Sequence, residues 1–145
     1  MHGKWHPKCS ECGKILKPQR VVKALGYDEV KRTTTTVGPE QEYFLVDKTY
    51  FDKREDLIYC GRTLFGVPAP KGQEMDDHYF GVIKPRVAAY MADLNEELWK
   101  LGILAKTRHN ETAPAQHELA PIYTTTNVAV DHNQLTMEFM KKLAP

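Results

Sequence analysis

Apolar residues recur with a helical period between Ile83 and Gly102. They are spaced alternately four and three residues apart, which places them on one stripe of a helix. The members of this stripe are Val87, Met91, Leu94, Leu98 and Leu101. Pro85 suits a first helical turn, and Gly102 suits the position just after a helix end. The pattern predicts a helix that covers a sheet with one face.

A second helix is predicted from about Asn127 to Leu143, with Leu135, Phe139 and Leu143 facing inward. A short helix is also predicted over 19–25, and Gly26 is placed to end it. The helix at 127–143, like the one at 83–102, is expected to serve as scaffold.

Extended structure is predicted from Val30 to Val37 and, after the turn-forming pair at 38–39, onward to Asp47. The stretch GPEQEYFLVD, residues 38–47, combines this turn with aromatic and β-branched residues. Side chains alternate between the faces of a strand, so Glu40, Glu42, Phe44 and Val46 share one face.

Two carboxylates on a strand face that also carries large apolar side chains allow two interpretations. Glu40 and Glu42 either lie at an exposed strand start, or they lie beneath a bound cation. Without a cation, their burial would be costly because like charges repel and lose water.

A hairpin is predicted over 103–123, with a turn at Ala113–Gln116 and a strand of about eight residues on each side. In this register Glu111 faces Glu118, and His109 shares the face of Glu111. Carboxylates opposite each other destabilise a plain antiparallel pair, unless something positive lies between them.

Crowded carboxylates suit Mg²⁺ or Mn²⁺ better than zinc. His117-Glu118 does not begin a zinc protease motif, because Pro121 occupies the position of the second histidine. Two glutamate pairs on two strand systems are therefore compatible with a two-metal site for phosphoryl chemistry.

Residues 48–81 lack a sustained period, and Gly and Pro are frequent from 61 to 81, which predicts a long functional loop. The stretch GVPAPKG at 66–72 lacks the GK[ST] ending of a P-loop, and GxGxxG is absent from the sequence. A nucleotide would have to be bound by other means.

The composition, with 41% hydrophobic and 27% charged residues, is that of a globular protein, and 145 residues can bury a core. A net charge of +1 gives no reason to expect nucleic acid or an anionic membrane surface as a partner. The longest uncharged stretch, 119–130, is too short to cross a bilayer. Three cysteines favour a reducing, cytoplasmic location over a disulfide framework.

Residues 1–17 differ from the rest and contain two histidines and a Cys-x-x-Cys, namely His2, His6, Cys9 and Cys12. These residue types form zinc sites, but here they all fall within eleven residues. The alternatives are a zinc-binding or interaction module and a divergent, disordered leader, and the leader is the expectation.

GPEQEYFLVD together with RHNETAPAQHELAP closely resembles glutamine synthetase, and most closely its type III branch. GRTLFGVPAPKGQEMDDHYFG and TNVAVDHNQLTMEFMKKLA resemble the same branch. The resemblance covers about residues 19–145, so residues 18–145 are identified as a partial catalytic domain. It implies an α+β fold of mostly antiparallel strands backed by two helices.

The resemblance also implies a reaction, the ATP-dependent joining of glutamate and ammonia through γ-glutamyl phosphate. Two divalent ions, Mg²⁺ or Mn²⁺, would hold the reactants. By motif, Glu40 matches a ligand of the ion at the ATP phosphates, whereas Glu42, Glu111 and Glu118 match the ligands of the second ion. A ring-forming homo-oligomer is implied for the parent enzyme.

Several family features have no counterpart before Pro145, among them the metal-binding histidine motif, later arginines and the small N-terminal domain. The expectation is an internal fragment that is inactive by itself. A decayed truncated copy is the alternative. The residues that bind ATP and glutamate are not assigned.

Overall fold

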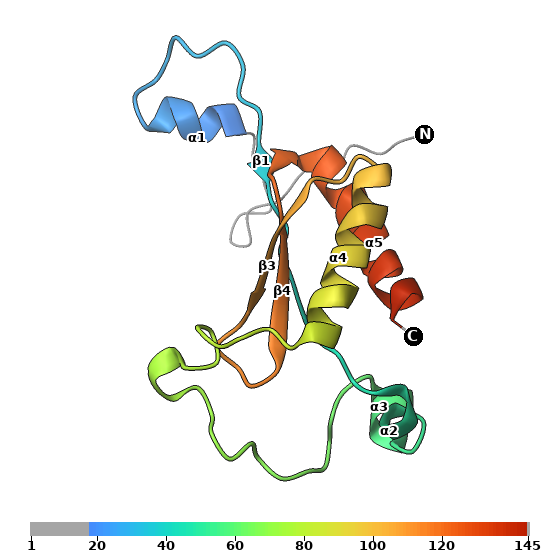
Figure 1. Cartoon of the computed structure of the whole chain (residues 1–145). Helices are drawn as coiled ribbons and strands as arrows, with labels where there is room; N and C mark the ends of the chain where they lie inside the picture. Colours follow the sequence, from blue (N-terminus) through green and yellow to red (C-terminus); the bar gives the residue numbers. More distant parts are fainter. Residues whose placement is uncertain (1–17, 145) are drawn as a thin grey trace.

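The computed structural model describes residues 18–144. At its centre is a three-stranded antiparallel sheet in the order β2-β4-β3. The strands are β2 (Gln41–Phe44), β3 (Ala105–Asn110) and β4 (Gln116–Pro121). Helices α4 (Pro85–Lys100) and α5 (Thr126–Leu143) lie on one side of the sheet (Figure 1). The expected α+β architecture, with antiparallel strands backed by two helices, is confirmed.

The core lies between α4 and the sheet. Four members of the predicted stripe on α4 are buried, and they meet Ile103, Ala105 and Leu119 in one cluster. Leu101 was predicted to join them, but this was wrong, because its side chain is 42% exposed. The α-helix ends at Lys100, so Leu101 leaves the stripe before Gly102 adopts a left-handed φ of 77°.

Helix α5 packs against α4, and Tyr90 links them by donating its hydroxyl to the carbonyl of Met140 at 2.8 Å. Phe139 and Leu143 are partly buried against the core, as predicted. The prediction for Leu135 was wrong, because this side chain is 37% exposed. The fully buried positions of α5 are instead Ala129 and Thr136, small residues seven apart that allow close approach.

The short N-terminal helix α1 (Pro18–Ala24) is confirmed, with Gly26 at a φ of 91° after its end. It buries none of its residues and projects away from the sheet (Figure 1). The extended prediction for 30–37 held only for β1 (Thr36–Val37), which pairs with β5 (Thr124–Thr125).

Residues 48–82, here called the connecting arm, loop away from the sheet (Figure 1). The prediction of one long loop was partly wrong, because the arm contains α2 (Lys48–Phe51), α3 (Glu55–Cys60) and the 3-10 turn η1 (Glu74–Asp76). Each is too short to leave a periodic apolar pattern in the sequence.

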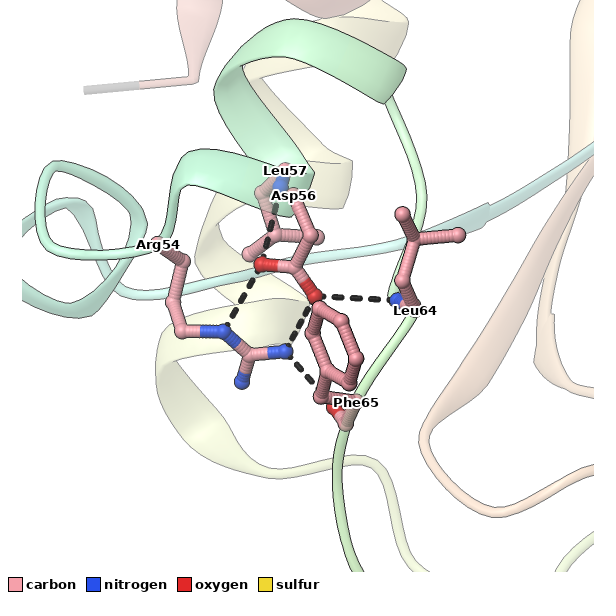
Figure 2. A network of polar contacts seen from close by, with 5 residues as sticks. All are labelled: Arg54, Asp56, Leu57, Leu64 and Phe65. Carbon is pink, nitrogen blue, oxygen red and sulfur yellow. Dashed lines mark hydrogen bonds and ion pairs between the residues drawn. The ribbon is translucent and has the colours of Figure 1, made fainter.

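A polar network fixes α3 to the chain that follows it (Figure 2). Asp56 forms a bidentate ion pair with Arg54, at 2.9 and 2.5 Å, and accepts from the amide of Leu64 at 2.9 Å. Arg54 also donates to the carbonyl of Phe65 at 2.8 Å. These contacts keep the pKa of Asp56 well below its usual range, with the Arg54 hydrogen bonds as the largest cause. This part of the arm is therefore held in its conformation by an ion pair and its hydrogen bonds, and not by a hydrophobic core.

Within residues 18–144, no helix is both long and apolar enough to cross a membrane. The zinc-ligand hypothesis for His2, His6, Cys9 and Cys12 concerns residues outside the described part of the chain.

Candidate functional site: a carboxylate and histidine cluster

The alternation expected for β2 is present, and it identifies the buried face. Gln41 and Tyr43 are half-buried, whereas Glu42 and Phe44 are exposed. Glu40 is exposed as well, and Val46 is 47% exposed. The two carboxylates thus lie on the face of β2 that points away from α4.

The β3–β4 hairpin has a different register from the one predicted. His109 lies opposite Glu118, and the amide of Glu111 bonds to the carbonyl of Gln116 at 2.8 Å. The predicted pairing of Glu111 with Glu118 was therefore wrong by two residues. The turn has the predicted length but lies one residue earlier, at 112–115, and its last residue, Ala115, takes a left-handed φ of 57°. A shift of two preserves the face of every side chain, so Glu111 and Glu118 still share one side.

The side chains of His109, Glu111 and Glu118 converge on this face of the hairpin. One potential ligand atom from each lies within 4.8 Å of the others. His109 Nδ1 lies 3.4 Å from a carboxylate oxygen of Glu111, and Nε2 contacts the carboxylate of Glu118. The ring of Tyr79, from the connecting arm, lies 5.1 Å from the imidazole.

Glu118 has the most perturbed acidity of the site. Burial raises the pKa of its carboxyl to about 7, assisted by hydrogen bonds with Glu40 and Glu111 and opposed by His109. Neighbouring carboxyl groups disfavour one another's ionised form, so Glu118 is harder to ionise here than in water.

The four predicted glutamates do not contribute equally to the cluster. Glu111 lies with Glu118 in the cluster, and Glu40 is near enough to raise the pKa of the Glu118 carboxyl. Glu42 is the register partner of Glu118, but its carboxylate accepts from Gln116 Nε2 at 2.7 Å. All four side chains belong to one face, with Glu42 at its edge.

Two carboxyl groups and one imidazole, with further carboxylates on the same face, make a chemically suitable set for Mg²⁺ or Mn²⁺, which prefer carboxylate ligands. His109 was noted in the sequence for its face but was not predicted as a ligand. The signal was its position two residues before Glu111, which places the two on one side of a strand.

A second polar pair, missed in the sequence, lies on the opposite face of the same hairpin. His117 is 8% exposed, and its Nδ1 lies 2.9 Å from Asn110 Oδ1. Tyr43 packs beside His117, with ring centroids 5.9 Å apart. Asn110 and His117 also border a groove of about 1040 Å³ between the hairpin turn and the start of α4.

Comparison with known proteins identifies a family that the chain matches. Residues 16–145 match the family described as glutamine synthetase, catalytic domain. A glutamine synthetase of Butyrivibrio fibrisolvens is 68% identical over 125 residues, which are 86% of this chain and 18% of the relative.

A type-3 glutamine synthetase of Dictyostelium discoideum is 47% identical over 114 residues, covering 79% of this chain and 16% of the relative. A glutamine synthetase of Bacteroides fragilis is 55% identical over 115 residues, with the same two coverages of 79% and 16%. The chain thus spans less than a fifth of the length of these curated relatives.

Proposed function

Because the chain belongs to the glutamine synthetase family, through the catalytic domain of that family, we propose that it is part of an ATP-dependent glutamate–ammonia ligase. The observation that carries this proposal to particular residues is the convergence of Glu111, Glu118 and His109 on one sheet face. ATP, glutamate and ammonia are the proposed substrates, and γ-glutamyl phosphate is the proposed intermediate.

Glu111 and Glu118, with Glu42 beside them, are the proposed ligands of one Mg²⁺ or Mn²⁺, and Glu40 is assigned to a second. His109 is added as a neighbouring donor, since its ring contacts both carboxylates. When bound, the ions would supply positive charge to the phosphate groups of a phosphoryl-transfer reaction.

The residues of this chain contribute a poorly hydrated surface of carboxyl groups that favours the binding of positive charge. The side chain of Glu118 is only 8% exposed, so water screens its charge poorly. Gln116 holds the Glu42 carboxylate in place by donating to it. Because its pKa is raised to about 7, Glu118 is partly protonated near neutral pH, and a bound proton must leave before the carboxylate can act as a ligand.

We propose that the isolated chain does not catalyse the synthetase reaction, because it offers Glu40 as the single assigned ligand of the second ion. In the parent enzyme, a cytoplasmic ring-forming homo-oligomer, other segments would supply the remaining ligands.

Calorimetric titration with Mn²⁺ tests the metal site. We expect weak binding by the wild-type chain and a loss of at least about tenfold in Glu111→Gln, the scale on which even outer-shell partners act. Glu138→Gln is the matched control, because Glu138 is exposed on α5 and pairs with Lys142. Equal affinities of the wild type and Glu111→Gln would refute the site.

Activity is tested separately by the formation of γ-glutamyl hydroxamate from glutamate, hydroxylamine, ATP and Mn²⁺. We expect no product from the purified chain. Product formation that disappears in Glu118→Gln would contradict the proposed inactivity while supporting the proposed chemistry.

A further inference from the structure

The side chain of Asn110 joins three segments of the molecule. Its Nδ2 donates to the carbonyl of Gly81 in the connecting arm at 2.9 Å. Its Oδ1 lies 2.9 Å from Nδ1 of His117 on the neighbouring strand. Asn110 is therefore bonded at both ends of its amide.

These two contacts determine the orientation of the amide and the tautomer of the histidine. The Gly81 carbonyl can only accept, so the amide nitrogen must face it. The amide oxygen then faces His117, whose Nδ1 must carry a hydrogen to donate. If the amide were reversed, its oxygen would face the carbonyl oxygen of Gly81 and repel it. Only one orientation of the amide therefore satisfies both contacts.

The bonded segment of the arm also carries Tyr79, whose ring packs beside the imidazole of His109. Tyr79, two residues before Gly81, lies 5.1 Å from His109, which is the chain neighbour of Asn110. Adjacent side chains of a strand point to opposite faces. The arm therefore contacts both faces of the hairpin, one through Asn110 and the other through the ring of Tyr79.

A side chain at Gly81 would crowd the arm's own backbone, whereas it would meet Asn110 only at an ordinary contact distance. A Cβ at this position would lie 3.1 Å from the carbonyl of His78 and 3.7 Å from Asn110 Nδ2. The flanking apolar residues do not anchor the arm here, because Phe80 is 81% exposed and Val82 is 92% exposed. The Asn110 bond thus fixes the arm at a point where Phe80 and Val82 contribute little packing.

We propose that Asn110 is a positioning residue, which ties the arm to the hairpin and so holds Tyr79 against the imidazole of His109 at the carboxylate cluster. Its effect on cation affinity rests on the proposed function, whereas its effect on His109 does not. Asn110 acts through Gly81 and Tyr79, and it does not itself belong to the ligand set.

The test uses Asn110→Ser, whose short neutral side chain cannot span both partners, and Gly81→Ala, which disturbs the same bond from the other side. Asn133→Ser is the matched control, because Asn133 accepts from Gln41 at 2.8 Å in a separate contact. The readout is the proton resonance of the His109 ring in metal-free protein, identified by its disappearance in His109→Gln.

We expect the His109 resonance to lose the ring-current shift of Tyr79 in both test variants and to keep it in Asn133→Ser. In a chain that binds Mn²⁺, we expect both test variants to bind it several-fold more weakly. An unchanged resonance in Asn110→Ser and Gly81→Ala would overturn the proposal. A shifted resonance with unchanged Mn²⁺ affinity would overturn its relevance to the cluster.

If the wild-type chain binds no Mn²⁺, the proposed function fails, and the His109 resonance still decides whether Asn110 positions the ring. Thermal unfolding of each variant, followed by circular dichroism, separates a local change from a loss of fold.

Discussion

The connecting arm and the packed half of the molecule, formed by β2, β3, β4, α4 and α5, are stabilised by different physics. In the packed half, Leu94 and Leu98 are completely buried between helix and sheet. In the arm, Tyr59 is 81% exposed and Val67 is 94% exposed, and the buried side chain is the charged Asp56. One region excludes water with apolar contacts, and the other is organised by an ion pair.

This difference explains where the candidate site lies. Clustered carboxyl groups repel one another, so they must be held by a rigid part of the fold. The hairpin supplies that support because its other face is packed on α4. The arm contributes the ring of Tyr79, which is 41% exposed and lies outside the core.

The largest expected effect comes from the packed half. Leu94→Ala should lower the free energy of unfolding by about 2–5 kcal/mol, because it leaves a cavity at a fully buried position. Denaturant unfolding measures this loss. Val67→Ala in the arm should leave the midpoint unchanged, and a comparable loss there would break the contrast between the regions.

A smaller effect with a distinct pH signature is expected for Glu118→Gln. The raised pKa of about 7 means that ionising Glu118 is unfavourable in the folded state. Its stabilising contribution is complete below the ordinary carboxyl pKa of 4.5 and is lost as pH rises through 7. The variant should therefore melt above the wild type at pH 8 and near it at pH 5, in the presence of EDTA.

Glu29→Gln, at an exposed position, is the control for this pH profile. A variant that melts below the wild type at pH 8 would show that Glu118 supports the fold as a carboxylate. The strain assigned to the cluster would then be absent.

The junction between the helices should be less sensitive. Tyr90→Phe removes the hydrogen bond to the Met140 carbonyl and should cost about 1 kcal/mol. Burial raises the pKa of Tyr90 to about 12, so this bond persists through mildly alkaline pH. Tyr50→Phe, in the exposed part of the arm, is the matched control for denaturant unfolding, and an equal cost there would contradict the assignment.

The smallest global effect is expected for Asp56→Asn. It should speed hydrogen exchange at the amide of Leu64 while leaving the melting temperature of the packed half unchanged. In the wild type, the lowered pKa of Asp56 stabilises the network above the ordinary aspartate pKa, and this is lost as pH falls toward the depressed folded value. Loss of the whole fold in Asp56→Asn would show that the arm and the packed half unfold together.

The sequence predicted best what depends on regular spacing. The stripe from Val87 to Leu98 could be located because one helix face meets one sheet, and Glu111 and Glu118 could be placed on one side from strand alternation alone. Leu101 and Leu135 were misassigned because periodicity gives the direction of a side chain and not the end of the helix or the position of its neighbour.

The remaining features depend on turn geometry and on distant partners. The left-handed Ala115 fixes which residue faces Glu118, and nothing in an Ala-Pro-Ala stretch specifies that conformation. The pairing of Asp56 with Arg54 and the contact of Asn110 with Gly81 join residues without a recognisable motif. Short polar contacts of this kind leave no period in a sequence.

The two-residue pairing of β1 with β5 has a consequence for the order of unfolding. It brings Thr36 to Thr125 and is extended by a bond between the hydroxyls of Thr35 and Thr126, at 2.8 Å. Because β2 already pairs Gln41 with Leu119, only a few residues separate this clasp from the sheet, and both residues of β1 are exposed. We expect the clasp to open before the packed half unfolds, so that its amides exchange hydrogen faster than those of β4.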